Sequence, residues 1–138
     1  MSNLAGFLKP LYTEETKEII ISDRFVDDDG KPLPFKLKTL SQTQMKGISK
    51  RSYREKYVNG KKVNEMDQDL FISRCLVESC VQPDFKDVEL CHAYGTEDPY
   101  DLPQKMLLVR EYEKLGRAFI ELNGLESSDI DLGEVTKN

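Results

Sequence analysis

The stretch DQDLFISRCLVESCVQP, residues 67–83, is the most apolar part of the chain and decides the fold. Its apolar residues cover well over half the circumference of a helix, and they are Leu70, Phe71, Ile72, Cys75, Leu76, Val77, Cys80 and Val81. A helix that is apolar around most of its surface lies in the middle of a core. Pro83 closes the segment, because the residue before a proline disfavours helical geometry. The stretch therefore predicts a central helix over about 66–82.

The segment well before this helix carries the pattern of a β-hairpin. A β-branched run, EIIISDRFV, is followed by DDDGKP and then by LPFKLKTL. In the last run Phe35 and Leu37 alternate with lysines, which is the period of a strand with one face in water. The connection is rich in aspartate, glycine and proline, which favour turns. We predict a hairpin over 18–40, preceded by a loosely ordered arm over 1–17.

A capping box marks the start of the next helix. Ser41 can accept a hydrogen bond from the backbone of Gln44, whose side chain can reach back to the first residue. The helix is predicted to run over about 41–56. The pair Asn59 and Gly60 then favours a tight turn, either in a second small hairpin or in a loop.

Two more helices are predicted in the second half of the chain. The first covers about 87–94 and ends before Gly95, and the second covers about 104–122 and ends before Gly124. Both glycines suit the left-handed position that follows a helix. The last residues, 126–138, are acidic and poor in aromatic residues, so we predict a flexible tail.

Composition and charge limit the classes of protein. The 138 residues fit one domain, which we predict to be α+β, mostly helical over 18–125, with an N-terminal β-hairpin. The chain has 25 acidic and 20 basic residues, so its net charge of −5 gives no overall attraction to nucleic acid or anionic lipid. No apolar run approaches the roughly 18–20 residues of a membrane-spanning helix. The N-terminus also lacks the pattern of a signal peptide, so we predict a cytoplasmic protein.

The only histidine, His92, directly follows Cys91, and a catalytic or metal site would have to start there. On a helix the two side chains diverge by about 100°, so they do not chelate one ion together easily. A zinc site would also need Cys75 and Cys80, whose spacing of five exceeds the usual two to four. The cysteines are more simply explained as small buried apolar residues.

Other catalytic patterns are missing from the sequence. There is no GxxxxGK[ST] phosphate-binding loop and no GxGxxG pattern. The sequence therefore predicts no catalytic, metal or cofactor residues and no enzyme. A small metal-dependent enzyme stays open as a third interpretation, which stoichiometric zinc in purified protein would favour.

Residues 46–62 form a basic segment with two tyrosines, Tyr53 and Tyr57, between the charges. Its only acidic residue is Glu55, and its basic residues are Lys46, Lys50, Arg51, Arg54, Lys56, Lys61 and Lys62. Such a segment can be a solvated face, a patch for a protein partner or a nucleic-acid patch. The last of these gives the alternative function of a nucleic-acid-associated regulator, which would show a steep salt-dependent affinity.

The helix predicted over 104–122 has an apolar stripe with recurrences at three and four residues. The stripe can face the core or form a groove for a partner helix. The candidate partner-binding residues on it are Met106, Leu108, Tyr112, Leu115 and Phe119.

Three segments in this order resemble the tail assembly chaperones of tailed phages and prophages, of the contractile-tail type found in Gram-positive bacteria. They are RFVDDDGKPLPFKLKTLS (24–41), VQPDFKDVELCHAYGTEDPYDLPQKML (81–107) and EYEKLGRAFIELNGL (111–125). The motif positions are Pro83, Asp84, Asp87, Leu90, Tyr94, Gly95, Met106, Leu107, Glu111, Tyr112, Leu115, Ile120, Glu121, Asn123 and Gly124. The pair Cys91 and His92 is not part of this motif.

The resemblance implies a non-enzymatic function in the bacterial host. Such chaperones bind the long helical tape measure protein and keep it soluble until the tail tube assembles around it. They are absent from the mature virion. The family often also makes a longer product by ribosomal frameshifting, so the implied partners are the tape measure protein, a longer form of this chain and further copies of it.

Overall fold

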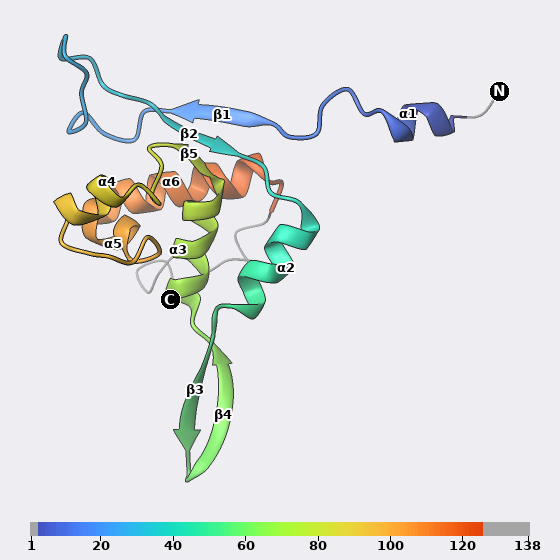
Figure 1. Cartoon of the computed structure of the whole chain (residues 1–138), viewed down its shortest axis with the longest axis vertical. Helices are drawn as coiled ribbons and strands as arrows, with labels where there is room; N and C mark the ends of the chain where they lie inside the picture. Colours follow the sequence, from blue (N-terminus) through green and yellow to red (C-terminus); the bar gives the residue numbers. More distant parts are fainter. Residues whose placement is uncertain (1–2, 126–138) are drawn as a thin grey trace.

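The structure is a computed structural model that describes residues 3–125. It confirms the predicted α+β class, with a mostly helical body and an N-terminal hairpin (Figure 1). The strands are β1 (Thr16–Ile19), β2 (Phe35–Lys38), β3 (Tyr53–Val58), β4 (Lys61–Met66) and β5 (Cys80–Gln82). The helices are α1 (Leu4–Leu8), α2 (Gln42–Lys50), α3 (Gln68–Ser79), α4 (Val88–Ala93), α5 (Leu102–Met106) and α6 (Val109–Leu122). Figure 1 shows two projections from the body, the N-terminal segment with α1 and the β3–β4 hairpin.

The central helix is α3, as the apolar stretch predicts. Its first turn is capped by Asp67, whose Oδ1 accepts a hydrogen bond from the backbone of Leu70 at 3.1 Å. The buried residues of α3 are Phe71, Ile72, Ser73, Cys75, Leu76, Val77 and Ser79. The helix ends at Ser79, earlier than predicted, and the next three residues form β5. The reason is that Pro83 disfavours helix upstream and that β2 offers these residues a strand to pair with.

The hairpin predicted over 18–40 pairs β1 with β2 in an antiparallel register, with Thr16 opposite Lys38. On β2, Phe35 and Leu37 are 2% and 0% exposed, while the lysines between them are half-buried. The predicted alternation is therefore confirmed. β5 adds a third strand on the other side of β2, which the sequence pattern did not predict.

The predicted capping box starts α2. The backbone N–H of Gln44 donates to Ser41 Oγ at 3.1 Å, and the backbone N–H of Ser41 donates to Gln44 Oε1 at 2.8 Å. The helix ends at Lys50 and not at residue 56. Buried Ser52 closes it, because its hydroxyl donates to the carbonyl of Ile48 at 2.7 Å.

The residues that follow α2 form the β3–β4 hairpin, so the prediction of helix over 51–56 is wrong. The two strands pair over six residue pairs, from Tyr53 opposite Met66 to Val58 opposite Lys61. The turn residues Asn59 and Gly60 have φ angles of 53° and 77°. Two positive φ angles are typical of the turn that matches the twist of a hairpin, which explains why Asn-Gly overrides the helical pattern before it.

The long helix predicted over 104–122 is divided into α5 and α6. Leu107 and Leu108 are extended, with ψ angles of 143° and 160°, so the chain turns between the two helices. At its far end α6 stops as predicted. The N–H of Gly124 donates to Glu121 and that of Leu125 donates to Ile120, the hydrogen bonds of a Schellman motif. The tail predicted over 126–138 lies outside the described residues.

Candidate protein-interaction site

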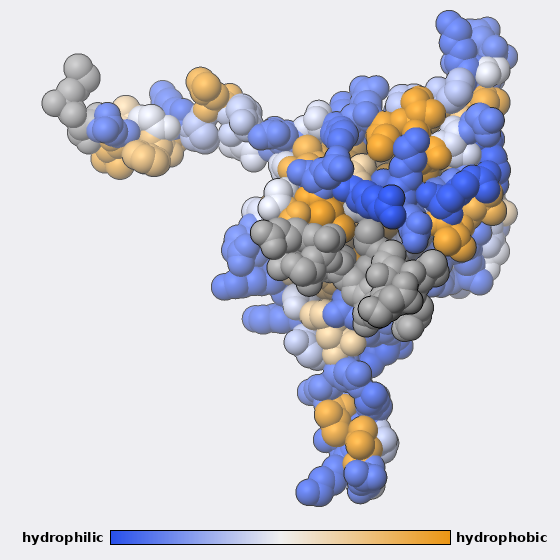
Figure 2. Space-filling model, turned by 180° about the vertical axis from the view of Figure 1, so that it is seen from behind, coloured by the Kyte–Doolittle hydropathy of each residue, from blue (hydrophilic) through white to orange (hydrophobic). Residues whose placement is uncertain are grey.

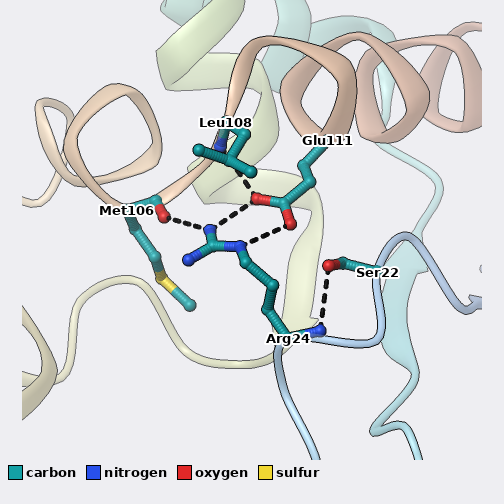
Figure 3. Close-up of polar contacts among 5 residues, drawn as sticks. All are labelled: Ser22, Arg24, Met106, Leu108 and Glu111. Atoms are coloured by element: carbon teal, nitrogen blue, oxygen red, sulfur yellow. Dashed lines mark hydrogen bonds and ion pairs between the residues drawn. The ribbon is translucent and has the colours of Figure 1, made fainter.

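A buried ion pair holds the junction between α5 and α6 (Figure 3). Arg24, in the connection between β1 and β2, donates from Nε and Nη2 to the carboxylate of Glu111 at 2.8 and 2.6 Å. Its Nη2 also donates to the carbonyl of Met106 at 3.0 Å. Oε1 of Glu111 accepts the backbone N–H of Leu108 at 2.8 Å. The pair therefore joins the end of α5, the start of α6 and the N-terminal connection.

The surroundings of this ion pair favour its charged form. The side chain of Glu111 is fully buried and that of Arg24 is 38% exposed. Hydrogen bonding from Arg24 lowers the pKa of Glu111 to about 2, with further help from Ser22 and the Leu108 N–H, although burial acts in the opposite direction. The same hydrogen bond raises the pKa of Arg24. Glu111 is thus ionised throughout the physiological pH range, and its position makes it a structural group.

The apolar stripe proposed for partner binding lies mainly inside the protein. Leu115 is 0% exposed, Phe119 2% and Met106 6%, and all three belong to the core cluster. Tyr112 is half-buried and Leu108 is 40% exposed. Four of the five candidate residues thus belong to the core or pack against it, and Leu108 is the most exposed of the five.

The N-terminal arm, which we define as residues 3–15, carries a group of exposed apolar side chains. Five large apolar side chains are exposed by 59–99%, and they are Leu4, Phe7, Leu8, Leu11 and Tyr12. Figure 2 shows orange surface along this arm, away from the body. Soluble proteins rarely keep such a contiguous apolar surface without a binding function.

Sequence reasoning missed this arm as a site, although the sequence contained a signal. Leu4, Phe7, Leu8 and Leu11 have the spacing of one apolar helix face. Pro10 hides the pattern, because a proline interrupts a helix and α1 ends before it.

The three cysteines are buried, in agreement with their interpretation as small apolar residues. Burial raises the pKa of Cys75 and Cys80 to about 12, and it also raises the pKa of Cys91. Within residues 3–125 no group of three potential ligands could hold a metal ion. Burial thus favours the protonated form of all three thiols.

We expect none of the three thiols to react with a disulfide reagent at pH 8 in the native protein. A thiol with a pKa near 12 is ionised to only about one part in 10⁴ at that pH, and its side chain is also shielded. The measurement is the absorbance of the thiolate that the reagent releases. A denatured sample is the control, in which all three cysteine thiols react. One fast-reacting thiol in the native sample would contradict the prediction.

Comparison with known proteins decides the family. A sequence model of the Phage XkdN-like tail assembly chaperone family, TAC, matches residues 4–137. The chain belongs to this family. Family membership points to a phage protein as partner and to a role other than catalysis.

Two relatives of this tail assembly chaperone occur in Bacillus subtilis (strain 168). The protein YqbN is 38% identical over 137 residues, which covers 96% of this chain and 92% of YqbN. The phage-like element PBSX protein XkdN is 37% identical over 137 residues, with 96% and 93% coverage. The crystal structure of YqbN superimposes with a TM-score of 0.71 at 33% identity, and covers 87% of this chain and 95% of that chain.

Several motif positions of the chaperone family lie at contacts between helices or at helix ends. Asn123 accepts the backbone N–H of Leu40 at 2.8 Å and donates to the carbonyl of Phe119 at 3.0 Å, so it ties the end of α6 to the start of α2. The hydroxyl of Tyr112 lies 3.2 Å from Ser73 Oγ on α3. Met106, Leu107 and Glu111 are buried around the ion pair, and Gly124 provides the turn after α6.

The other motif positions surround α4. Pro83, Asp84 and Leu90 line a shallow recess of about 430 Å³, together with Asp87, Glu89 and Ala93. Tyr94 packs against the core and Gly95 ends the helix with a φ angle of 76°. The lining of this recess combines three apolar residues with three carboxylates.

The β3–β4 hairpin of the chaperone carries much of the basic segment noted in the sequence. Nearly all of its side chains are exposed, including Tyr53 at 52% and Tyr57 at 73%. Three of its cations are paired with carboxylates, namely Arg54 with Asp67, Lys56 with Glu65, and Lys62 with Glu55. These pairs reduce the positive charge that the hairpin offers to a nucleic acid.

A polar recess of about 240 Å³ lies at the base of this hairpin. Its lining residues are Arg54, Asp67, Asp69, Leu70, Ser73, Asp98, Tyr100, Asp101 and Gln104. Ser73 and Gln104 are hydrogen-bonded to each other, and Arg54 is paired with Asp67.

In residues 3–125 no helix has the length and apolar character needed to cross a membrane.

Proposed function

We propose that this tail assembly chaperone binds the tape measure protein through its N-terminal arm and keeps it soluble while the tail assembles. The exposed apolar surface of the arm carries the proposal. Phe7 and Leu11 are 82% and 99% exposed, so they contact almost nothing within the described chain. Binding an apolar helix of the partner would remove both from water, at about 1.5–3 kcal/mol for each side chain.

The structure of the arm is consistent with a segment that a partner orders. The helix α1 has five residues, and isolated helices shorter than about 12 residues are marginal in water. Leu108 and Val109, which are 40% and 70% exposed, provide a smaller second contact at the accessible end of the predicted stripe. Each of these two contacts alone is weak. Tail-tube subunits that bind the same partner can therefore displace it from the chaperone.

The proposal places this binding in the cytoplasm of the bacterial host, before the virion is complete, and involves no catalysis. A longer frameshift product would carry the same arm and could hold the same partner. Self-association would increase the number of arms that meet one tape measure protein, whose length requires many contacts.

The test is co-expression with the tape measure protein encoded beside this chain. We expect the double variant Phe7→Ser/Leu11→Ser to weaken binding roughly a hundredfold or more, because two buried apolar side chains are lost. The measurements are the amount of soluble tape measure protein and the affinity by calorimetry. The circular dichroism of the variant should be unchanged, since neither residue contributes to the core.

The matched control is Val88→Ser, which removes a side chain that is 66% exposed on α4, away from the arm. It should leave the yield of soluble complex unchanged. Equal yields for the wild type and the arm variant would contradict the role of the arm, and an insoluble tape measure protein with the wild type would contradict the proposed function itself.

A further inference from the structure

The free end of the β3–β4 hairpin is both apolar and basic. We define this tip as residues 57–62, which are the end of β3, the turn and the start of β4, and which contain two lysines and no carboxylate. Tyr57 is 73% exposed and Val58 is 44% exposed. Lys61 forms no salt bridge within residues 3–125. Figure 2 shows apolar surface among hydrophilic residues in the outer part of the hairpin.

The hairpin holds this tip away from the body of its own chain. At its base the backbone N–H of Asp67 donates to the carbonyl of Ser52 at 2.8 Å, and Arg54 is paired with Asp67. The six residue pairs, at about 3.4 Å per residue, place the tip roughly 20 Å beyond this base. In Figure 1 the hairpin points away from α4 and from the other helices. The tip is therefore placed to meet a surface on another molecule.

The recess of about 430 Å³ at α4 has the opposite charge and an apolar part of its own. None of its three carboxylates forms a salt bridge within residues 3–125, and the nearby Lys86 is paired with Glu78. Asp84 and Asp87 each use one oxygen to accept a backbone N–H, which leaves the other oxygen for a partner. The lining residues are Pro83, Asp84, Asp87, Glu89, Leu90 and Ala93.

We propose that the hairpin tip of one copy of this chain docks in the α4 recess of a second copy. Tyr57 enters the apolar part of the recess, and Lys61 and Lys62 lie against its carboxylates. Charge complementarity carries this assignment, because two lysines without a carboxylate in the tip meet three carboxylates without a cation in the recess lining. Burial of the exposed Tyr57 ring adds an aromatic anchor of the kind that dominates protein interfaces.

The proposed contact is directional and reversible. Each copy contributes a tip on one side and a recess on the other, so the contact is heterologous and not a two-fold pair. A six-residue tip in a shallow recess is a small contact compared with the roughly 1,200–2,000 Å² that stable complexes bury. Two chains of net charge −5 also repel each other as a whole. Association therefore depends on the protein concentration, and it involves neither the N-terminal arm nor the tape measure protein.

The test is sedimentation equilibrium of the full-length chain alone, from micromolar to millimolar concentration. We expect the average mass of the wild type to rise above the 15.9 kDa of one chain. The tip variant Y57S/K61E and the recess variant E89K/A93Y should each stay at the mass of one chain, since all four positions are exposed and only the contact is lost. The matched control Y53S/K46E makes the same two substitutions as the tip variant at exposed positions outside the tip, and should associate like the wild type.

Mixing the two variants tests which surfaces meet. The tip variant keeps an intact recess and the recess variant keeps an intact tip, so an equimolar mixture should form a dimer of twice the mass of one chain. The inference is overturned if the wild type stays at the mass of one chain, if either variant associates like the wild type, or if the mixture forms no dimer. Circular dichroism checks that each variant is folded, and the single substitutions K61E and E89K repeat the comparison if a double variant is not.

Discussion

Replacing Leu115 with aspartate is expected to unfold the protein. Leu115 lies on α6, is 0% exposed and belongs to the core cluster. The variant loses the burial of a leucine, creates a cavity and places a carboxylate in an apolar interior, and together these effects cost more than about 5 kcal/mol. Single domains have a total stability of about 5–15 kcal/mol, so most or all of it would be lost.

Circular dichroism at 25 °C and a thermal melt measure this effect. We expect a loss of helical signal and no cooperative transition. The control is Val109→Asp, at an exposed position in the first turn of the same helix, where a negative charge is favourable. If the Leu115→Asp protein melts like the wild type but no longer binds a partner, then Leu115 lines a groove and its assignment to the core is wrong.

The second large effect is expected from Arg24→Met. The substitution leaves the carboxylate of Glu111 buried without its main partner, and breaking a buried pair in this way typically costs about 3–5 kcal/mol. The control is Lys17→Met, which breaks the exposed pair with Glu121 and should cost less than about 1 kcal/mol. Urea unfolding curves of both variants measure the difference. Equal losses for Arg24→Met and Lys17→Met would show that Glu111 is accessible to water.

The Glu111 ion pair also predicts a dependence of stability on pH. The pKa of Glu111 is lowered from 4.5 to about 2 in the folded protein, so its contribution is fully present above pH 4.5 and is lost as the pH falls toward 2. The lowered pKa corresponds to about 3 kcal/mol. The Glu111→Gln variant has no carboxylate to protonate at this position. Its free energy of unfolding should therefore fall less between pH 5 and pH 2 than that of the wild type.

Local signals in the sequence predicted much of this fold. The capping box at Ser41, the alternation in β2 and the Schellman motif at Gly124 each depend on a few neighbouring residues, and the structure confirms all three. The class of the protein and its family could also be predicted, because three motif segments occur in a fixed order. Such features need no knowledge of the distant parts of the chain.

The errors arose where distant segments decide the local structure. Cys80 and the two residues after it continue a helical pattern, but they pair with β2, more than 40 residues earlier in the chain. The division between α5 and α6 depends on Glu111 and on Arg24, which is 87 residues away. Helical spacing alone also left open whether the candidate stripe faces the core or a groove, since it does not distinguish the two. The sequence of the arm contains the spacing of an apolar helix face, but Pro10 interrupts the helical pattern.

The ion pair between Arg24 and Glu111 has a consequence for synthesis on the ribosome. Chains emerge at about 5–20 residues per second, so the 87 residues between these two groups separate their appearance by roughly 4–17 s. During this interval β1 and β2 have neither α6 nor the tie from Asn123 to Leu40. β1 and β2 therefore gain these contacts only after α6 has been synthesised, and the described domain of the chaperone folds only once residues up to about 125 have emerged.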